Sequence, residues 1–291
     1  MDKLKMMTET ISDSAGSIMS EWKAKADKGE GEAEIELSSQ FEELTADVIS
    51  RTAFGGSHKE GKQVCLAQRD LQFLAFSAVY NVVQIPALGY LPTEKNLKIR
   101  KLDKEVRGIL ADIIKSRLTT NDQKLREEVM RECGSAVPTA DMLNKLKLLN
   151  MFLLETLRLY NPVSVIQRKA GSDLEIGGIK VPQGTVLTIP IATIHRDKEV
   201  WGEDANEFKP LRFENGVTRA SKHPNAFLSF SSGPRSCIGK NFAMIEAKIV
   251  IVMIIQRFSC SLSPKYVHAP MDVITLRPKF GLPMILNSLD M

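Results

Sequence analysis

Apolar residues recur at helical spacing through the first third of the chain. The first stripe lies before the glycine-containing segment 28–32 and consists of Leu4, Met7, Ile11, Ile18, Met19 and Trp22. This spacing predicts an amphipathic helix, and the glycines predict its end. Further helices are predicted from about Ser39 to Gly55–Gly56, over 61–83, and from near Thr93, where an apolar stripe continues to Ile114.

The remainder of the chain mixes helical and strand patterns. A helix is predicted to finish within 124–133, and a second helical region to run over 139–159 and end before Asn161–Pro162. Short apolar runs on both sides of Gly177–Gly178 predict a hairpin of 174–176 with 179–181, followed by a strand over 185–191. An irregular segment over 201–223, a helix over 240–258 and short strands over 274–286 complete the pattern. The predicted fold class is mainly α with a small β-sheet.

The composition is that of an ordinary globular protein. The 291 residues suffice for one large domain or two ordinary ones, and 43% of them are hydrophobic and 25% charged. The net charge of +4 is slight, and no basic stripe is interleaved with aromatic residues, so no nucleic-acid partner is expected. The longest strongly apolar run, 249–255, is too short to cross a bilayer.

The four cysteines lie far apart, and no two of them form a C-x-x-C pair. This spacing argues against a zinc site and against a dense disulfide framework, and it favours reduced thiols. A lone cysteine is more often a small buried hydrophobic residue than a functional one, so the surroundings of each cysteine decide how it is interpreted.

One cysteine, Cys237, has surroundings that suit a thiolate ligand. Phe230, Gly233, Arg235, Cys237 and Gly239 stand at offsets 0, 3, 5, 7 and 9, a combination expected by chance in about one sequence in ten thousand. Arg235 and the start of the helix that follows supply positive charge for a thiolate. The two glycines permit a tight turn, and Phe230 can cover the sulfur. We therefore predict that Cys237 is the axial thiolate ligand of a haem iron.

A second motif is the pair Glu155 and Arg158, three residues apart on one predicted helix face. An exposed pair of this kind would contribute little to stability. The neighbouring residues are nearly all apolar, which predicts that the pair is buried and needs further partners. Arg212, in the stretch 210–213, is a candidate third member.

Taken in order, these three motifs resemble those of the cytochrome P450 family. The resemblance implies that Glu155, Arg158 and Arg212 form a triad that holds the region behind the cysteine. It implies that Arg235 binds a haem propionate and that Arg168 binds a second one. The alternative for Arg168 is a surface arginine at a strand edge.

Several shorter segments narrow the resemblance to plant enzymes of the secologanin-synthase-like group, which hydroxylate terpenoids and related hormones. These segments are 47–55, 126–129 and 222–224. The resemblance implies a haem-thiolate monooxygenase that inserts one oxygen atom of O2 into a small, apolar, terpenoid-like substrate. Electrons would come from NADPH through an NADPH–cytochrome reductase docking near Lys240 and Arg257, at the cytosolic face of the endoplasmic reticulum membrane.

The chain also departs from the family pattern, and it is expected to be a single incomplete domain. Residues 1–123 would form its helical part and 124–291 its haem-ligand part. The membrane anchor and the early helices of the family are not found, so a cytosolic location is a second expectation. The long central helix is not found between Ile114 and Lys124, where Thr119–Thr120 lacks the small-residue and acidic pattern that precedes the family's threonine. No catalytic residue is therefore assigned.

These departures leave alternative functions open. One is a non-catalytic remnant that binds haem, or no haem at all, and retains Cys237. Another is a helical interaction module with an incidental cysteine motif, which three family motifs in the family's order disfavour.

Overall fold

A computed structural model describes residues 2–54, 123–273 and 275–289. The described chain divides into two compact units. The first contains residues 1–146, 245–273 and 278–291, and the second contains 147–244 and 274–277. Several predictions fall outside the described residues. They are the helices over 61–83 and from Thr93, and the region of the expected central helix with Thr119–Thr120. The predicted single domain with parts 1–123 and 124–291 stays a prediction.

The predicted first helix is confirmed as α1 (Asp2–Lys28). Its buried face repeats every three or four residues and consists of Ile11, Ala15, Met19, Trp22 and Ala26. The Trp22 ring lies 6.3 Å from that of Phe41 and 6.2 Å from that of Phe258, and its indole N–H donates to Gln40. Because the tryptophan has both apolar partners and an acceptor, it can be almost completely buried.

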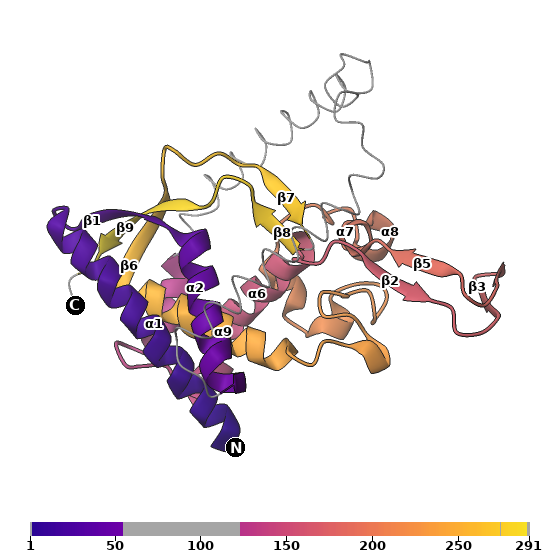
Figure 1. Ribbon diagram of the computed structural model, residues 1–291, viewed down its shortest axis with the longest axis horizontal. Helices are drawn as coiled ribbons and strands as arrows, with labels where there is room; N and C mark the ends of the chain where they lie inside the picture. The colour runs from indigo at the N-terminus through magenta and orange to yellow at the C-terminus, as the bar shows by residue number, and fades with distance from the viewer. Residues whose placement is uncertain (1, 55–122, 274, 290–291) are drawn as a thin grey trace, which may run out of the picture. The chain divides into compact units, whose positions relative to one another are not determined.

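The first unit also contains a three-stranded antiparallel sheet in the order β1–β9–β6 (Figure 1). The strands are β1 (Glu32–Glu36), β9 (Pro283–Ser288) and β6 (Phe258–Leu262). Strand β9 agrees with the predicted short strands near the C-terminus. Strands β1 and β6 were not predicted, because each is short and its pairing partner is distant in sequence.

Helix α2 (Leu37–Ile49) follows β1 directly and continues into a π-helical turn, η1 (Ser50–Phe54). The carboxylate of Glu36 caps α2 by accepting the N–H groups of Ser38 at 3.1 Å and Ser39 at 2.8 Å. The same carboxylate accepts the N–H of Leu282 at 2.6 Å, just before β9. At Gly281 (φ +76°) a Cβ atom would lie 2.6 Å from the Glu36 carboxylate, so this turn requires glycine. One side chain thus joins the helix start to a segment almost 250 residues later.

The helical region predicted over 139–159 is two helices, α5 (Ala140–Lys145) and α6 (Lys147–Leu159). Leu146 separates them, with a ψ of 77° that no helix allows. Leu146 is completely buried. The helical character predicted for 139–159 is thus confirmed, and the break at Leu146, which stands between Lys145 and Lys147, was not predicted.

The second unit combines α6 with two small antiparallel sheets and several single turns of helix. Strand β2 (Ile166–Lys169) pairs with β5 (Val186–Ile189), and the predicted hairpin is confirmed as β3 (Leu174–Ile176) with β4 (Ile179–Val181) (Figure 1). Gly177 and Gly178 have φ angles of 56° and 81°, as the tight turn requires. The short helical turns are α7 (Ile191–Ile194), α8 (Lys198–Trp201), η2 (Pro210–Phe213), η3 (Val217–Arg219) and η4 (Gly233–Arg235).

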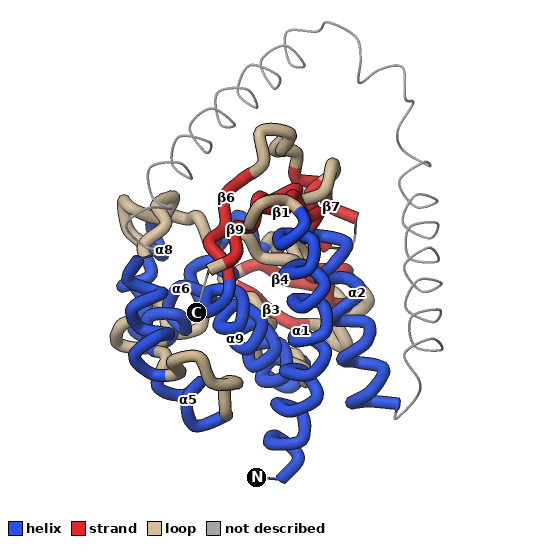
Figure 2. Tube along the Cα trace, turned by 90° about the vertical axis from the view of Figure 1, so that its left-hand side faces the viewer, coloured by secondary structure: helices blue, strands red, loops and turns tan. Residues whose placement is uncertain are grey.

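The C-terminal helix α9 (Lys240–Arg257) begins in the second unit, and its residues from Ile245 onward belong to the first. Strands β7 (Pro270–Val273) and β8 (Thr275–Pro278) follow. Figure 2 shows helices and short strands together, which confirms the predicted class of a mainly helical protein with little sheet. Within the described ranges, no helix has the length and apolarity that crossing a membrane requires.

Replacing Glu36 by alanine is expected to lower the free energy of unfolding by about 1–2 kcal/mol, because three backbone N–H groups lose one acceptor. Urea unfolding followed by circular dichroism measures the change. The control is Glu34→Ala in the same strand, which breaks only the exposed ion pair with Lys265 and should cost less than about 1 kcal/mol. An equal loss in the two variants would show that the cap does not join α2 to the turn before β9.

Candidate functional site

The core of the candidate site is the ion pair between Glu155 and Arg158 on α6. Both side chains are completely buried. The Arg158 guanidinium donates from Nε to one carboxylate oxygen at 2.7 Å and from Nη2 to the other at 2.8 Å. This two-pronged geometry is the strongest that an arginine and a carboxylate can form.

The other N–H groups of Arg158 bind backbone carbonyls of the irregular segment that follows β5. Nη1 donates to the carbonyls of His195 and Ala205, both at 2.6 Å, and Nη2 donates to that of Glu207 at 3.0 Å. A buried ion pair is stable only when its remaining donors and acceptors are also satisfied. Here the acceptors for the remaining N–H groups of Arg158 come from a segment with almost no regular secondary structure. The ion pair therefore holds that segment against α6.

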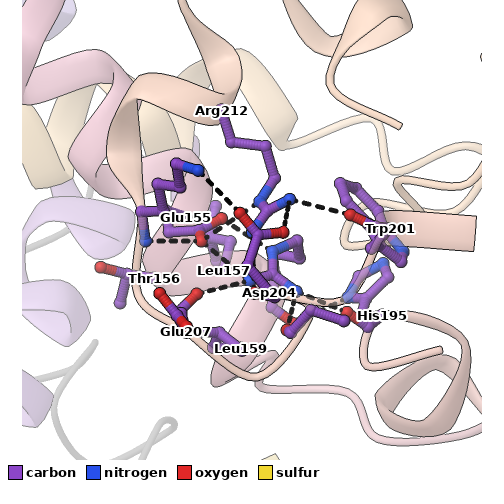
Figure 3. A network of polar contacts seen from close by, with 12 residues as sticks. Glu155, Thr156, Leu157, Leu159, His195, Trp201, Asp204, Glu207 and Arg212 are labelled. Atoms are coloured by element: carbon purple, nitrogen blue, oxygen red, sulfur yellow. Dashed lines mark hydrogen bonds and ion pairs between the residues drawn. The ribbon is translucent and has the colours of Figure 1, made fainter. Parts of the chain in front are cut away.

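Arg212, on η2, completes the predicted group of three. Its Nε lies 3.6 Å from Glu155 Oε1, a distance of charge attraction rather than of a hydrogen bond. Its Nη1 donates to the carbonyl of Trp201 and pairs with the Asp204 carboxylate at 2.9 Å, and its Nη2 donates to the carbonyl of Asp204 (Figure 3). Glu155 also accepts the backbone N–H of Lys209 at 2.8 Å. The structure therefore brings Glu155, Arg158 and Arg212 together.

Asp204 and His195 belong to this network and were missed by the sequence analysis. Hydrogen bonds from Lys209 and Arg212 lower the pKa of Asp204. Within the irregular stretch 194–207, which contains five acidic residues, the spacing of His195, Trp201 and Asp204 places the three on no single helix face or strand face. Only the fold of the segment around Arg158 brings them together.

The His195 side chain is completely buried and hydrogen-bonded at both ring nitrogens. Nδ1 lies 2.9 Å from the carbonyl oxygen of Arg158, and Nε2 accepts the N–H of Leu228 at 2.9 Å. Burial lowers the pKa of His195 to about 4, and the positive charges of Arg158 and Arg196 act in the same direction. The ring is therefore neutral at pH 7.

The cysteine segment begins only two residues after Leu228. The N–H of Cys237 donates to the carbonyl of Phe230 at 2.8 Å, which closes a loop of the intervening residues. Gly233 in that loop has φ +74° and Ser231 has φ +60°, so both lie in the left-handed region. Residues 232–238 are all exposed, including Cys237, while Phe230 is half-buried. The loop thus presents a thiol to its surroundings on a closed backbone.

The remaining predicted residues are distributed around this loop. Arg168, on β2, is exposed and donates from Nη2 to the Ser231 hydroxyl at 3.2 Å. Arg235 is exposed on η4. A Cβ atom at Gly239 would lie 3.8 Å from the Cys237 sulfur, an ordinary contact distance. Gly233 is therefore needed for its positive φ angle, whereas Gly239 leaves the position beside the sulfur free of a side chain.

Comparisons with known proteins identify the family of this chain. The family model described as Cytochrome P450 matches residues 120–283. Cytochrome P450 709B3 of Arabidopsis thaliana is 41% identical over an alignment that covers 99% of this chain and 68% of that protein. The chain belongs to the cytochrome P450 family. Cytochrome P450 734A1 of Arabidopsis thaliana is 36% identical to this chain, and Cytochrome P450 CYP72A219 of Panax ginseng is 35% identical to it. Each alignment covers 99% of this chain.

Membership confirms the predicted family and its plant character. Cytochromes P450 are haem-thiolate monooxygenases that receive electrons from a redox partner, so haem is the cofactor and oxidoreductase the class of this P450. The alignment with the 709B3 protein runs over 354 positions, 63 more than the 291 residues of the chain, so at least 63 positions of that relative have no counterpart here.

Replacing Arg158 by lysine is expected to lower the free energy of unfolding of this P450 by about 3–5 kcal/mol, because lysine cannot make the two-pronged contact and leaves Glu155 buried with poor compensation. Urea unfolding measures the loss. Arg131→Lys is the control, since Arg131 is 65% exposed and pairs with the neighbouring Glu132, and it should change stability by less than about 1 kcal/mol. A small effect of Arg158→Lys would mean that the irregular segment does not depend on the guanidinium.

His195 is expected to make the P450 chain less stable as the pH falls from about 6.5 to about 4. In this window the unfolded chain binds a proton at His195 and the folded chain does not, so the free energy of unfolding declines, by up to about 3 kcal/mol from this group. The difference in unfolding free energy between the wild type and His195→Gln, measured at pH 7, 5.5 and 4.5, isolates the contribution. Parallel pH profiles of the two proteins would contradict it.

Proposed function

We propose that Cys237 is the axial ligand of haem in this P450, and that the chain is a monooxygenase acting on a small apolar substrate of terpenoid type. The observation that carries the proposal is the exposed thiol on a loop closed by the hydrogen bond from the Cys237 N–H to the Phe230 carbonyl. An exposed thiol with a fixed backbone can meet a metal without rearrangement of the main chain.

The exposed groups around the loop fit the chemistry of haem, which is a flat apolar macrocycle with two carboxylates. Ile238, directly after the cysteine, is fully exposed and offers an apolar surface. Arg235 and Arg168 offer two guanidinium groups for the carboxylates. Arg235 lies in the loop, and Arg168 lies on β2, where it is hydrogen-bonded to the Ser231 hydroxyl of the loop. The proposed haem residues are thus Cys237, Arg235, Arg168, Phe230, Gly233 and Gly239.

Each of these residues has a distinct task in the proposal. Haem, when bound, supplies the activation of dioxygen, which a thiolate ligand promotes. Cys237 would hold the iron, while Phe230 would keep water from the sulfur and Gly233 would permit the turn. Glu155, Arg158 and Arg212 would keep the irregular segment that follows β5 in place against α6. No residue is assigned to proton delivery.

The finer parts of the proposal concern substrate, partner and location. A terpenoid-like substrate is supported by the resemblance of segments 47–55, 126–129 and 222–224 to plant enzymes of that kind. Lys240, the exposed first residue of α9, is proposed as the contact for an NADPH–cytochrome reductase, with Arg257 at the other end of the helix. The cytosolic face of the endoplasmic reticulum membrane is the proposed location.

A second candidate function is a non-catalytic relative that retains the haem ligand. The observation that favours it is the set of at least 63 positions of the 709B3 protein that have no counterpart in the 291 residues, in an alignment of 354 positions. Residues lost from the interior of an enzyme fold remove walls and positioning groups of its pocket. This candidate predicts haem binding without turnover.

The test is the carbon monoxide difference spectrum of the chain expressed with added haem, beside Cys237→Ser. A strongly red-shifted Soret band, typical of a thiolate ligand, is expected in the wild type and should be lost in the variant. Cys260→Ser, which removes a half-buried thiol from β6, is the control and should keep the band.

The same preparations separate the two candidates. A thiolate band together with product formation from a terpenoid, in the presence of a plant reductase and NADPH, supports the monooxygenase. A thiolate band with NADPH oxidation but no product supports the non-catalytic relative. A band unchanged by Cys237→Ser would overturn both, because haem would then be bound elsewhere.

A further inference from the structure

The buried ring of His195 lies between two parts of the second unit that the proposed function requires. On one side is the backbone of α6 at Arg158, which belongs to the ion-pair network. On the other side is Leu228, two residues before Phe230. The ring is also packed between aromatic neighbours, parallel to Phe227 at 5.5 Å and edge-on to Trp201 at 5.9 Å.

The hydrogen bonds determine which nitrogen carries the proton. Leu228 offers a backbone N–H, so Nε2 must be the acceptor and cannot hold a hydrogen. The neutral ring then carries its hydrogen on Nδ1, which donates it to the carbonyl oxygen of Arg158. The ring therefore has one acceptor and one donor, and both are used in a completely buried position.

The residues after Leu228 are fixed one after another. The Ser229 hydroxyl donates to the carbonyl of Leu157 on α6 at 3.1 Å. The Phe230 carbonyl then accepts the N–H of Cys237 at 2.8 Å. Phe227, on the other side of Leu228, packs on the apolar cluster formed by Trp201, Phe213 and their neighbours. The exposed cysteine loop thus departs from a base that Ser229 attaches to α6 directly and Leu228 attaches through the His195 ring.

We propose that His195 is a positioning residue for Cys237: its neutral ring connects the α6 backbone at Arg158 to the Leu228 N–H and so fixes the base of the cysteine loop. The proposal goes beyond the proposed haem ligation, and its spectroscopic readout rests on that function. Its second readout, backbone hydrogen exchange, does not.

A purely apolar role for the ring makes a different prediction. If His195 only filled space, phenylalanine would replace it well, since the ring is stacked on Phe227 and lies edge-on to Trp201. If the two hydrogen bonds matter, phenylalanine leaves the Leu228 N–H and the Arg158 carbonyl buried without partners. Glutamine is the rescue variant, because its amide oxygen can take the acceptor position of Nε2.

The experiment measures amide hydrogen exchange by mass spectrometry over the peptide containing residues 227–231, in the full chain without haem. Exchange in His195→Phe is expected to be roughly tenfold faster than in the wild type, the order expected for one lost buried hydrogen bond. His195→Gln should restore most of the protection. Trp201→Phe is the control for general destabilisation, because it removes the indole bond to the Ile194 carbonyl within the same apolar cluster.

The second measurement is the fraction of carbon monoxide-bound haem that shows the thiolate band. His195→Phe should reduce this fraction several-fold, whereas His195→Gln and Trp201→Phe should retain most of it. Wild-type exchange over 227–231 in His195→Phe would overturn the proposal, and so would equal effects of His195→Phe and Trp201→Phe on both measurements.

The two proposals can fail separately. If the wild-type chain with haem shows no thiolate band, the haem ligation by Cys237 fails, and hydrogen exchange still decides the role of His195. If the wild type shows the band and His195→Phe retains both the band and the protection of Leu228, the positioning role fails and the ligation stands.

Discussion

The buried guanidinium of Arg158 is the interaction on which the second unit depends. An arginine carries five N–H donors, and here each of them meets one acceptor: both oxygens of the Glu155 carboxylate and the carbonyls of His195, Ala205 and Glu207. The three carbonyls belong to a segment that has only single helical turns to satisfy its own backbone. Buried carbonyls without partners are costly, so a chain without long helices or strands needs such a donor inside. The charge of Arg158 is in turn tolerated only because Glu155 balances it.

This constraint extends to the cysteine loop through short steps. His195 both gives its carbonyl to Arg158 and receives the hydrogen bond of Leu228. Ser229 returns to α6 at Leu157, and Phe230 closes on Cys237. The loop that carries the exposed Cys237 thiol is thus supported from beneath by polar contacts of buried and half-buried groups. Such support is how a protein can hold a group in place without covering it.

Much of this arrangement could be predicted from sequence, for reasons that differ between elements. Helix α1 and the β3–β4 hairpin follow from local periodicity and from two adjacent glycines. The burial of Glu155 and Arg158 was predicted because a pair of charges stands in an apolar helix, whereas their grouping with Arg212 came from the resemblance to the family. The break at Leu146, strand β1 and the role of His195 could not be predicted in this way. Strand β1 depends on β9 and the His195 ring on Leu228, both distant in sequence, and nothing in the residues next to Leu146 marks the break.

The pairing of β1 with β9 has a consequence for biosynthesis. Glu32 is paired with Asn287, so on the ribosome β1 must wait for about 250 further residues, or roughly 10–50 s at ordinary elongation rates. During this time the strand is an unpaired edge, the kind of segment that joins with other chains. Its sequence, Glu-Ala-Glu-Ile-Glu, places Glu32 and Glu34 on the exposed face opposite Ala33 and Ile35. Charged side chains hinder the pairing of an edge strand with other chains, so Glu32 and Glu34 suit β1 to the interval before its partner strand is made.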